Sequence, residues 1–223
     1  MPKSNPLRHP LLRSLPLPLL NAAFPAFRVL CQLCYFLAHH LQLLLPRRQP
    51  RQQQSRAVGR LVHVGYSWSG LPKASRQRAF ATPLGLLGDR CRSAWVASWG
   101  GHGGMDKAVC LFDAARVDAL REAGHPIRPG AVGDNLLVAG LPWNEAARPG
   151  QRLRICRPGK STSDGVLLEI SEVTAPCGTT KGPFLKGDNS LMDERKHPGC
   201  SRWYARVLRT GWLAPGDEVH WLS

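Results

Sequence analysis

The sequence predicts a mainly β, barrel-like domain with one or two short helices, preceded by a disordered N-terminal extension. From Val58 to Ser223, short runs rich in β-branched residues recur between Gly and Pro turns, and one segment shows helical spacing of its apolar residues. Residues 1–57 differ in composition, because they contain eight Lys or Arg and no Asp or Glu. Many short strands with few helices are typical of a barrel or a sandwich.

Seven runs in residues 58–223 have strand character, because they alternate apolar and polar residues or are rich in β-branched ones. They are Arg60–Ser67, Lys107–Phe112, Asn135–Leu141, Gln151–Arg157, Gly165–Val173, Arg202–Leu208 and Asp217–Ser223. The helix candidate is Asp113–Gly124, in which Val117 and Leu120 are three positions apart. An Asp at its start and a Gly at its end are residue types that cap and stop a helix.

The extension, residues 1–57, is apolar and basic but interrupted by prolines. Its longest uncharged piece, residues 29–45, has 17 residues and includes Gln32 and two histidines. That length is at or below the minimum for a membrane-spanning helix. A basic, acid-free start matches an organelle transit peptide; a membrane-surface segment and a mis-started extension are the alternatives. The polar stretch RRQPRQQQSR at its end places the domain boundary near Ala57.

The formal net charge of +15 is shared unevenly. Residues 58–223 contain 22 basic and 15 acidic residues, a moderate excess that suits an anionic ligand or a nucleic acid. The seven cysteines are scattered and odd in number, unlike a secreted disulfide framework. Cys31 and Cys34 form a C-x-x-C pair, but no second pair stands nearby to complete a zinc site. We therefore expect a reducing compartment, cytoplasmic or organellar (mitochondrial or plastid), and not secretion.

Three polar patches are suited to binding an anion. The first, SGLPK, is a turn that ends in the ammonium group of Lys73. The second, within Gly85–Val109, combines cationic side chains with glycine turns whose backbone N–H groups can cradle an oxyanion. It matches neither a P-loop nor a dinucleotide-binding motif, and a flexible turn is the alternative. In the third patch Asn135 follows Gly and Asp, where it reads a polar ligand or caps a turn.

Cys177 stands at the end of the apolar run GVLLEISEVTAP and is followed by Gly178 and, four positions on, Lys181. A thiol at a strand end beside a cation is accessible and can have a lowered pKa, which makes it a nucleophile or a metal ligand. The alternative is a small buried apolar side chain. A zinc site with His197 and Cys200 is a further alternative, although the three residues are widely spaced.

The order of these patches resembles that of a MOSC domain, the family named for the C-terminal domain of molybdenum cofactor sulfurases. The motifs that carry the resemblance are SGLPK, GLLGD, HGGMDKAV, GHPIRPGAVGDNL, GLPW, PGQRLRI, LLEISEVTAPC and RWYARVLRTGWLAPGDEV. They extend collinearly from Gly59 to Leu222 and exclude the extension. The chain departs from the family pattern by carrying Asp134 where Glu is common and Cys91 where His is common.

The resemblance implies a MOSC-type β-barrel-like domain over residues 58–223 that binds the molybdenum cofactor (molybdopterin), with an essential cysteine at Cys177. A phosphorylated pterin dithiolene needs cationic side chains and backbone N–H groups, and its molybdenum accepts a soft thiolate. Cys177 is therefore the expected catalytic residue and molybdenum ligand. The residues expected to bind the rest of the cofactor are Lys73, Arg90, His102, Gly103, Gly104, Lys107, Asn135 and Arg206.

The function implied by this family is that of a molybdenum-dependent oxidoreductase that reduces N-hydroxylated compounds. The sequence has no flavin, haem or iron–sulfur signature, so such an enzyme depends on a separate electron-transfer reductase. The alternative is a carrier that receives sulfur from a donor and holds it as a persulfide on Cys177, or holds the cofactor, without turnover. Pyridoxal phosphate is not expected, because this sequence lacks the aminotransferase-like domain of the sulfurases.

A basic nucleic-acid-binding β-barrel is the alternative from another functional class. Trp203 and Tyr204 are adjacent and so point to opposite faces of a strand, unlike the interleaved aromatic residues of an RNA-recognition sheet. We therefore expect no nucleic-acid partner, and we expect any membrane contact to involve the extension.

Overall fold

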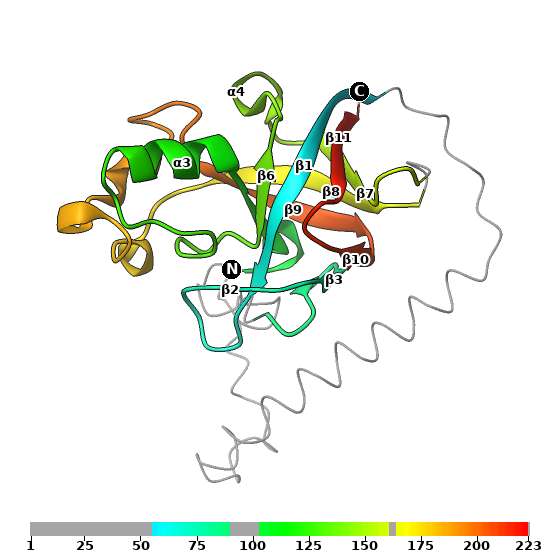
Figure 1. Ribbon diagram of the computed structural model, residues 1–223, viewed down its shortest axis with the longest axis horizontal. Helices are drawn as coiled ribbons and strands as arrows, with labels where there is room; N and C mark the ends of the chain where they lie inside the picture. The colour runs from blue at the N-terminus through cyan, green and yellow to red at the C-terminus, as the bar shows by residue number, and fades with distance from the viewer. Residues whose placement is uncertain (1–54, 90–102, 161–163, 223) are drawn as a thin grey trace, which may run out of the picture. The chain divides into compact units, whose positions relative to one another are not determined.

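The structure, a computed structural model, describes residues 55–89, 103–160 and 164–222 (Figure 1). It is mainly β, and seven of its strands form a closed barrel, as the sequence predicts. These strands are β1 (Ser55–Tyr66), β5 (Val109–Asp113), β6 (Leu136–Ala139), β7 (Arg152–Cys156), β8 (Val166–Thr174), β9 (Arg202–Arg209) and β11 (Glu218–Leu222). Each of the seven runs predicted from the sequence corresponds to one of them.

The barrel follows the strand order β11-β7-β8-β9-β5-β6-β1, and hydrogen bonds between β1 and β11 close it. Figure 1 shows these two strands side by side, in cyan and red. Neighbouring strands are antiparallel except β5 and β6, which are parallel. A parallel pair needs a crossover connection, and helix α3 (Ala114–Glu122) supplies it. The side chain of Asp113 caps this helix by accepting a hydrogen bond from the backbone N–H of Ala115.

The barrel core is built by the two-residue alternation of strand side chains. In β9, Ala205 and Val207 are buried in the core, whereas Arg206 between them is partly exposed. In β8, Leu168 and Ile170 are fully buried. Apolar burial of this kind is the main favourable contribution to folding, so the barrel provides a fixed frame for the loops at its ends.

Four short strands lie beside the barrel strands, and the sequence did not indicate them. They are β2 (Ala74–Ser75), β3 (Ala79–Thr82), β4 (Gly85–Leu86) and β10 (Gly211–Leu213). β10, β3 and β4 form a separate three-stranded sheet, and β2 pairs with the end of β1. Strands of two or three residues are too short to show a two-residue period, which explains why pattern analysis misses β2, β4 and β10.

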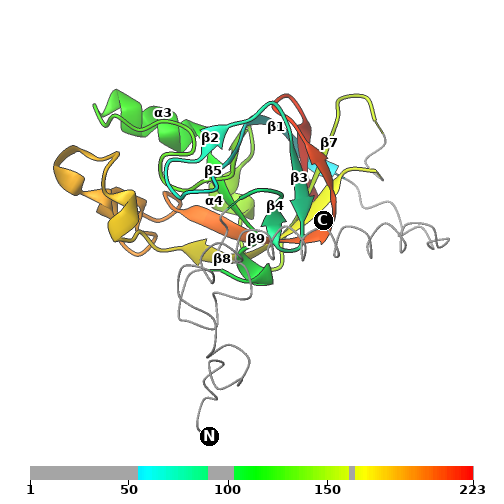
Figure 2. The same ribbon diagram turned by 90° about the horizontal axis from the view of Figure 1, so that it is seen from below.

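The remaining elements are one short helix and four 3-10 turns. They are α4 (Trp143–Ala146), η3 (Met105–Lys107), η4 (Gly178–Thr180), η5 (Leu185–Gly187) and η6 (Asn189–Met192). A second, smaller core packs side chains of α3, β5 and β6 against the segment 178–192, through Val117, Phe112, Leu137, Phe184 and Met192. Figure 2 shows α3 and this gold segment on the same side of the barrel, away from β7.

Several predictions from the sequence concern residues outside the described ranges. These are residues 1–54 of the extension, the Cys31–Cys34 pair, Cys91, and two of the predicted cofactor-binding residues, Arg90 and His102. The domain boundary near Ala57 likewise stays a prediction. Within the described ranges, none of the helices has the length and hydrophobicity needed to span a bilayer.

Candidate functional site

Cys177 lies just beyond the barrel, at the start of the 3-10 turn η4. β8 ends at Thr174, and Pro176 follows two residues later. Proline has no backbone N–H to donate to a strand ladder, so the chain leaves the sheet immediately before the thiol. Cys177 is half-buried and still has extended backbone angles (φ −134°, ψ 174°). The sequence-based prediction of an accessible thiol after a strand is confirmed.

Hydrogen bonds hold the turn that carries this thiol. The Thr180 hydroxyl oxygen accepts from the backbone N–H of Cys177 at 3.3 Å and donates to its carbonyl at 2.9 Å. The amide nitrogen of the buried Asn189 side chain lies 2.7 Å from both that carbonyl oxygen and the Thr180 hydroxyl oxygen. Because these bonds join η4 to η6, they fix the position of the thiol relative to the loop that follows it.

The surroundings of Cys177 favour the thiolate. Burial alone would raise the pKa of this thiol, but three neighbours outweigh it and hold the pKa below its ordinary value. These are hydrogen bonds from the Thr179 hydroxyl and backbone N–H, the charge of Arg202, and the backbone N–H of Thr180. The Cys177 Sγ lies 3.0 Å from the Thr179 Oγ1. The sequence had suggested Lys181 as the activating cation, whereas Arg202 fills that role in the structure.

Arg202 comes from the first position of β9, where its backbone pairs with Thr174 at the end of β8. Its side chain is buried, with 3% exposure, and its Nη1 donates to the carbonyl of Val132. A guanidinium group cannot lose its proton in a protein, so this position keeps a fixed positive charge beneath the loops. That charge lowers the pKa of both Cys177 and the buried Cys110.

A buried polar cluster, which we define as Lys73, Asp89, Cys110 and Asn135, adjoins this arginine. The Lys73 Nζ lies 2.6 Å from the Asp89 Oδ2, and the Asn135 Nδ2 donates to the same oxygen at 2.8 Å. The Asn135 Oδ1 accepts from the backbone N–H of Cys110 at 3.0 Å. Two predicted site residues, Lys73 and Asn135, are therefore joined through a carboxylate that the sequence analysis did not single out.

The cluster and Arg202 form one electrostatic region. Burial raises the pKa of the Cys110 thiol, and the charges of Arg202 and Lys73 oppose that effect from two directions. In addition, a methyl group placed on Gly133 would lie 3.5 Å from the Arg202 Nη1 and 3.3 Å from a Leu71 methyl carbon. The SGLPK turn, the GAVGDN turn and the first residue of β9 therefore lie close together.

His63 and Asp134 add a buried titratable pair to this region. Burial, the largest effect, lowers the pKa of His63 and raises the pKa of Asp134, and their mutual attraction only partly opposes this. The Asp134 Oδ2 accepts from the backbone N–H of Gly130 at 2.8 Å. Gly130 has a positive φ of 80°, and a Cβ there would overlap the carbonyl of Lys73, so this turn requires glycine.

Several buried side-chain atoms of this region have no hydrogen-bond partner among the described residues. They are the His63 Nε2, the Asp134 Oδ1 and the Arg202 Nε. Buried polar atoms are rarely left without a partner, because an unmade bond costs about 1–3 kcal/mol. A group of such atoms in one region is what a site for a polar ligand requires.

Lys107 and Arg206 belong to a different group, which we call the surface ion-pair cluster. Lys107 in η3 pairs with Glu172 of β8 at 3.1 Å. Arg206 of β9 pairs with Asp106 at 2.6 Å and with Glu169 of β8 at 2.9 Å. Gly103 and Gly104 lead into η3 beside this cluster. These ion pairs join Lys107 and Arg206 to neighbouring acids of η3 and β8, and contact of the two residues with a cofactor stays a prediction.

The structure also bears on two alternative hypotheses from the sequence, a zinc site and a nucleic-acid-binding surface. Cys177, His197 and Cys200 do not bring their ligand atoms together into a metal-binding group within the described ranges. Trp203 packs against the barrel core. The Lys107 Nζ lies over the ring of the adjacent Tyr204, 5.4 Å from the ring centre. The two aromatic side chains thus point to opposite faces of β9, as expected from the sequence.

The residues missed by sequence analysis are Asp89, Arg202, His63, Thr179 and Asn189. Asp89 lies within the motif GLLGD, and its position before Arg90 and Arg92 is the available signal. Arg202 lies four positions before Arg206, and nothing local distinguishes the two. They are separated by burial, which depends on loops distant in sequence.

Comparison with known proteins supports the resemblance. The uncharacterized protein YflK of Bacillus subtilis (strain 168) is 31% identical over 123 residues, which are 55% of this chain. The match covers 51% of YflK, so the chain spans about half the length of this curated relative.

Solved structures share the fold at low sequence identity. The YuaD protein of Bacillus subtilis is 16% identical with a TM-score of 0.53, over 77% of this chain and 100% of that one. YiiM of Geobacillus stearothermophilus is 19% identical with a TM-score of 0.50, over 74% and 73%. The family model described as "MOSC domain" matches residues 100–220, which include β5 to β10, the first part of β11 and Cys177. This chain therefore belongs to the MOSC domain family.

Proposed function

We propose that this chain binds the molybdenum cofactor with Cys177 as its thiolate ligand, and that it reduces N-hydroxylated compounds. The observation that carries the proposal is a fixed, half-buried thiol with a lowered pKa, next to the buried cation Arg202. Perturbed thiols of this kind cluster at functional sites. Membership in the MOSC family supports the cofactor as the ligand.

Cys177 and the residues around Arg202 fit such a ligand in three respects. The Cys177 sulfur is a soft donor, which suits molybdenum bound to dithiolene sulfur. The Arg202 Nε and the Asp134 Oδ1, which have no hydrogen-bond partner among the described residues, offer a donor and an acceptor to polar groups of a pterin. A methyl group on Gly178, directly after the thiol, would meet no atom within 4 Å, so the backbone beside Cys177 can be approached closely.

Each described residue has a separate role in this proposal. Arg202 and the Thr179 hydroxyl lower the pKa of Cys177, which would favour the thiolate as a metal ligand. Lys73 has three N–H donors, of which the bond to Asp89 uses one, and it would hold an anionic part of the cofactor. Asn135 holds Asp89, and thereby Lys73, in place.

The cofactor would supply two-electron oxygen-atom chemistry when bound. The chain's own residues would bind it, hold the thiolate and keep water from the buried end of the site. Electrons would come from a separate reductase, since the family resemblance implies such a partner and the sequence shows no flavin, haem or iron–sulfur signature.

The test compares the parent protein with Cys177→Ser after anaerobic purification from a host that makes the cofactor. Molybdenum is measured by elemental analysis, and reduction of an N-hydroxylated amidine is followed with reduced viologen as electron donor. We expect the parent to contain molybdenum and to turn over, and Cys177→Ser to lose turnover. Cys200→Ser is the matched control, because Cys200 is also half-buried and lies at the end of the same loop; it should behave like the parent.

Other outcomes assign a different function. A cyanide-labile sulfur on Cys177 without molybdenum would identify a sulfur carrier. Salt-sensitive RNA binding by protein that contains no cofactor would identify a nucleic-acid-binding barrel. Full activity and full molybdenum content in Cys177→Ser would reduce Cys177 to a packing residue.

A further inference from the structure

A second group of potential ligands lies on the outer face of β7 and β11. Cys156 of β7 is the direct cross-strand partner of Glu218 of β11, and His220 follows Glu218 by two residues on the same face. Their neighbours Ile155 and Val219 point into the barrel core. One sulfur, one carboxylate oxygen and one imidazole nitrogen from these three side chains all lie within 4.8 Å of one another.

The distances are close to those of a metal site. A tetrahedral zinc ion has bonds of about 2.0–2.3 Å to such ligands, which places the ligand atoms roughly 3.3–3.8 Å apart. The His220 Nε2 and the Glu218 Oε2 are already 3.3 Å apart. The three ligand atoms all lie within 4.8 Å of one another, so they need to approach by on the order of 1 Å to reach the spacing of a zinc site.

Burial distinguishes this group from an ordinary surface ion pair. Cys156 and His220 are each 5% exposed, although they point away from the barrel core. The His220 Nδ1 is buried and has no hydrogen-bond partner among the described residues. Glu218 is the accessible member, with a side chain that is 35% exposed, so an ion can enter along its carboxylate.

The charges around the group permit a dication. Glu218 and Asp217 are the carboxylates that act on the Cys156 sulfur, and Arg154 and Arg209 are the cations. The Arg209 Nε donates to the carbonyl of Gly165 at 2.6 Å, which directs that guanidinium group to the backbone. With the thiolate included, three negative charges and two arginines sum to −1, and a bound dication changes the sum to +1, so neither state carries a large net charge.

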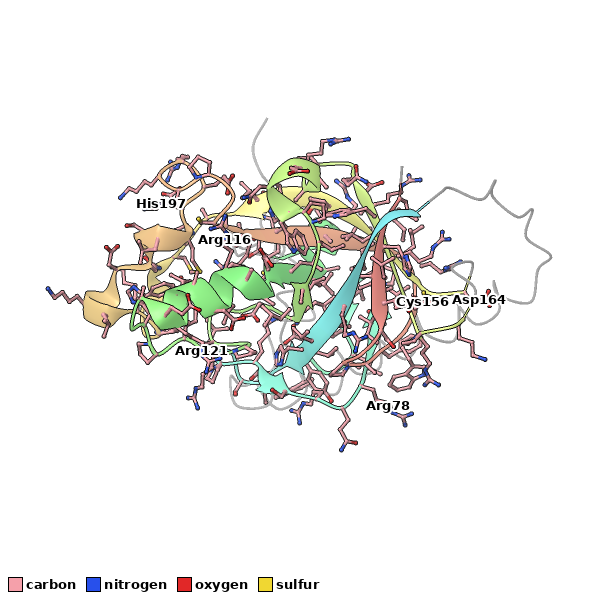
Figure 3. All side chains as sticks on the ribbon, turned by 45° about the horizontal axis from the view of Figure 1, so that its top comes forward. Arg78, Arg116, Arg121, Cys156, Asp164 and His197 are labelled. Carbon is pink, nitrogen blue, oxygen red and sulfur yellow. The ribbon has the colours of Figure 1, made fainter. Side chains whose placement is uncertain are left out.

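We propose that Cys156, Glu218 and His220 bind a zinc-class divalent cation, with three protein ligands and a fourth position for water or another ligand. A thiolate, an imidazole and a carboxylate are the three ligand types that zinc accepts in proteins. The site does not depend on the proposed function. Figures 1 and 3 place β7 and Cys156 on the side of the barrel opposite to the segment 178–192 that follows Cys177.

The test titrates cobalt(II), a spectroscopic substitute for zinc, into the full chain purified without metal under reducing conditions. We expect a thiolate-to-cobalt charge-transfer band with one equivalent bound, and its loss when zinc is added in competition. Glu218→Gln and Cys156→Ser should each weaken cobalt binding by more than the roughly 10- to 100-fold caused by loss of an outer hydrogen-bond partner. Glu218→Gln alters a half-exposed side chain, so this variant tests the site even if Cys156→Ser does not fold.

Two control variants locate the thiolate that binds cobalt. Cys177→Ser and Cys200→Ser remove the two half-buried thiols of the described chain and should leave the band unchanged. The proposal is overturned if the band is absent from the parent, if it persists in Cys156→Ser, or if it disappears in Cys177→Ser instead. Unchanged binding in a folded Glu218→Gln would also overturn the three-ligand site.

Discussion

The buried polar cluster and the surface ion-pair cluster each contain a salt bridge of 2.6 Å, yet they lie in opposite environments. The Lys73 and Asp89 side chains are 12% and 1% exposed, whereas those of Arg206 and Asp106 are 39% and 63% exposed. In water the attraction between two charges is screened and small, and in a protein interior it is several times larger. The two salt bridges therefore have the same length but very different interaction energies.

The comparison also changes how the predicted site is understood. The sequence placed Lys73, Asn135, Lys107 and Arg206 in one anion-binding pocket. In the structure the first two share a buried carboxylate near Arg202, and the other two are paired with acids of β8 and η3. A buried charge without its partner is costly, so losing a member of the first cluster should reduce stability more than losing a member of the second.

The largest expected effect is that of Asp89→Ala in the buried polar cluster. This change leaves the Lys73 ammonium group, the Asn135 amide and the backbone N–H of Ser67 without their shared acceptor. Breaking a buried ion pair from one side costs about 3–5 kcal/mol. Urea unfolding of the parent and the variant measures the difference, and a loss below about 1 kcal/mol would contradict the contrast between the clusters.

Asn135→Ala should have the next largest effect. The side chain is 1% exposed and makes hydrogen bonds to the Gly65 carbonyl, the Asp89 carboxylate and the Cys110 N–H. Leaving such buried groups unpaired costs about 1–3 kcal/mol. The same urea experiment measures this loss of stability. A variant as stable as the parent would show that water replaces the amide and that the cluster is accessible to solvent.

Arg206→Ala should cost no more than about 1 kcal/mol, because exposed ion pairs are screened by solvent and salt. Asp106→Ala is the matched variant from the other side of the same pair. We expect both differences to shrink further when unfolding is measured in high salt. A salt-independent loss as large as that of Asp89→Ala would remove the distinction between the clusters.

The smallest effect on stability is expected from Thr179→Val, which removes the hydroxyl beside Cys177. The pKa of Cys177 is lowered in the folded protein, so the linked stabilisation is present above the thiol's ordinary pKa and is lost as the pH falls through the folded-state pKa. At pH values below both, the variant loses no thiolate-linked stability.

The reactivity of the Cys177 thiol reports a change in its pKa more directly than stability does. The midpoint of Cys177 alkylation by iodoacetamide against pH should rise in Thr179→Val and stay near that of the parent in Thr179→Ser. Mass spectrometry of the peptide that contains Cys177 separates it from the other thiols. An unchanged midpoint in Thr179→Val would assign the lowered pKa to Arg202 and the backbone N–H groups.

The barrel strands could be predicted because their signals are local. Each has at least four residues, and the alternation in β9 from Arg202 to Arg209 is readable in the sequence itself. The site could be predicted only in part. Cys177 follows a strand and a proline, which is a local signal, whereas Arg202 and Asp89 gain their roles from burial by the loops around Gly133 and Ser67. Burial of this kind arises from contacts distant in sequence, which no window of residues contains.

Closure of the barrel by β1 and β11 has a consequence for the chain while it is being synthesised. β11 is the last barrel strand to leave the ribosome, and it pairs with both β1 and β7. Until then the nascent chain carries two unpaired strand edges, which are templates for association with other chains. Contacts between strands so far apart in sequence also form slowly. A chain that ends before Glu218 therefore forms an open sheet with two unpaired strand edges that can associate with other chains, and not a slightly shorter barrel.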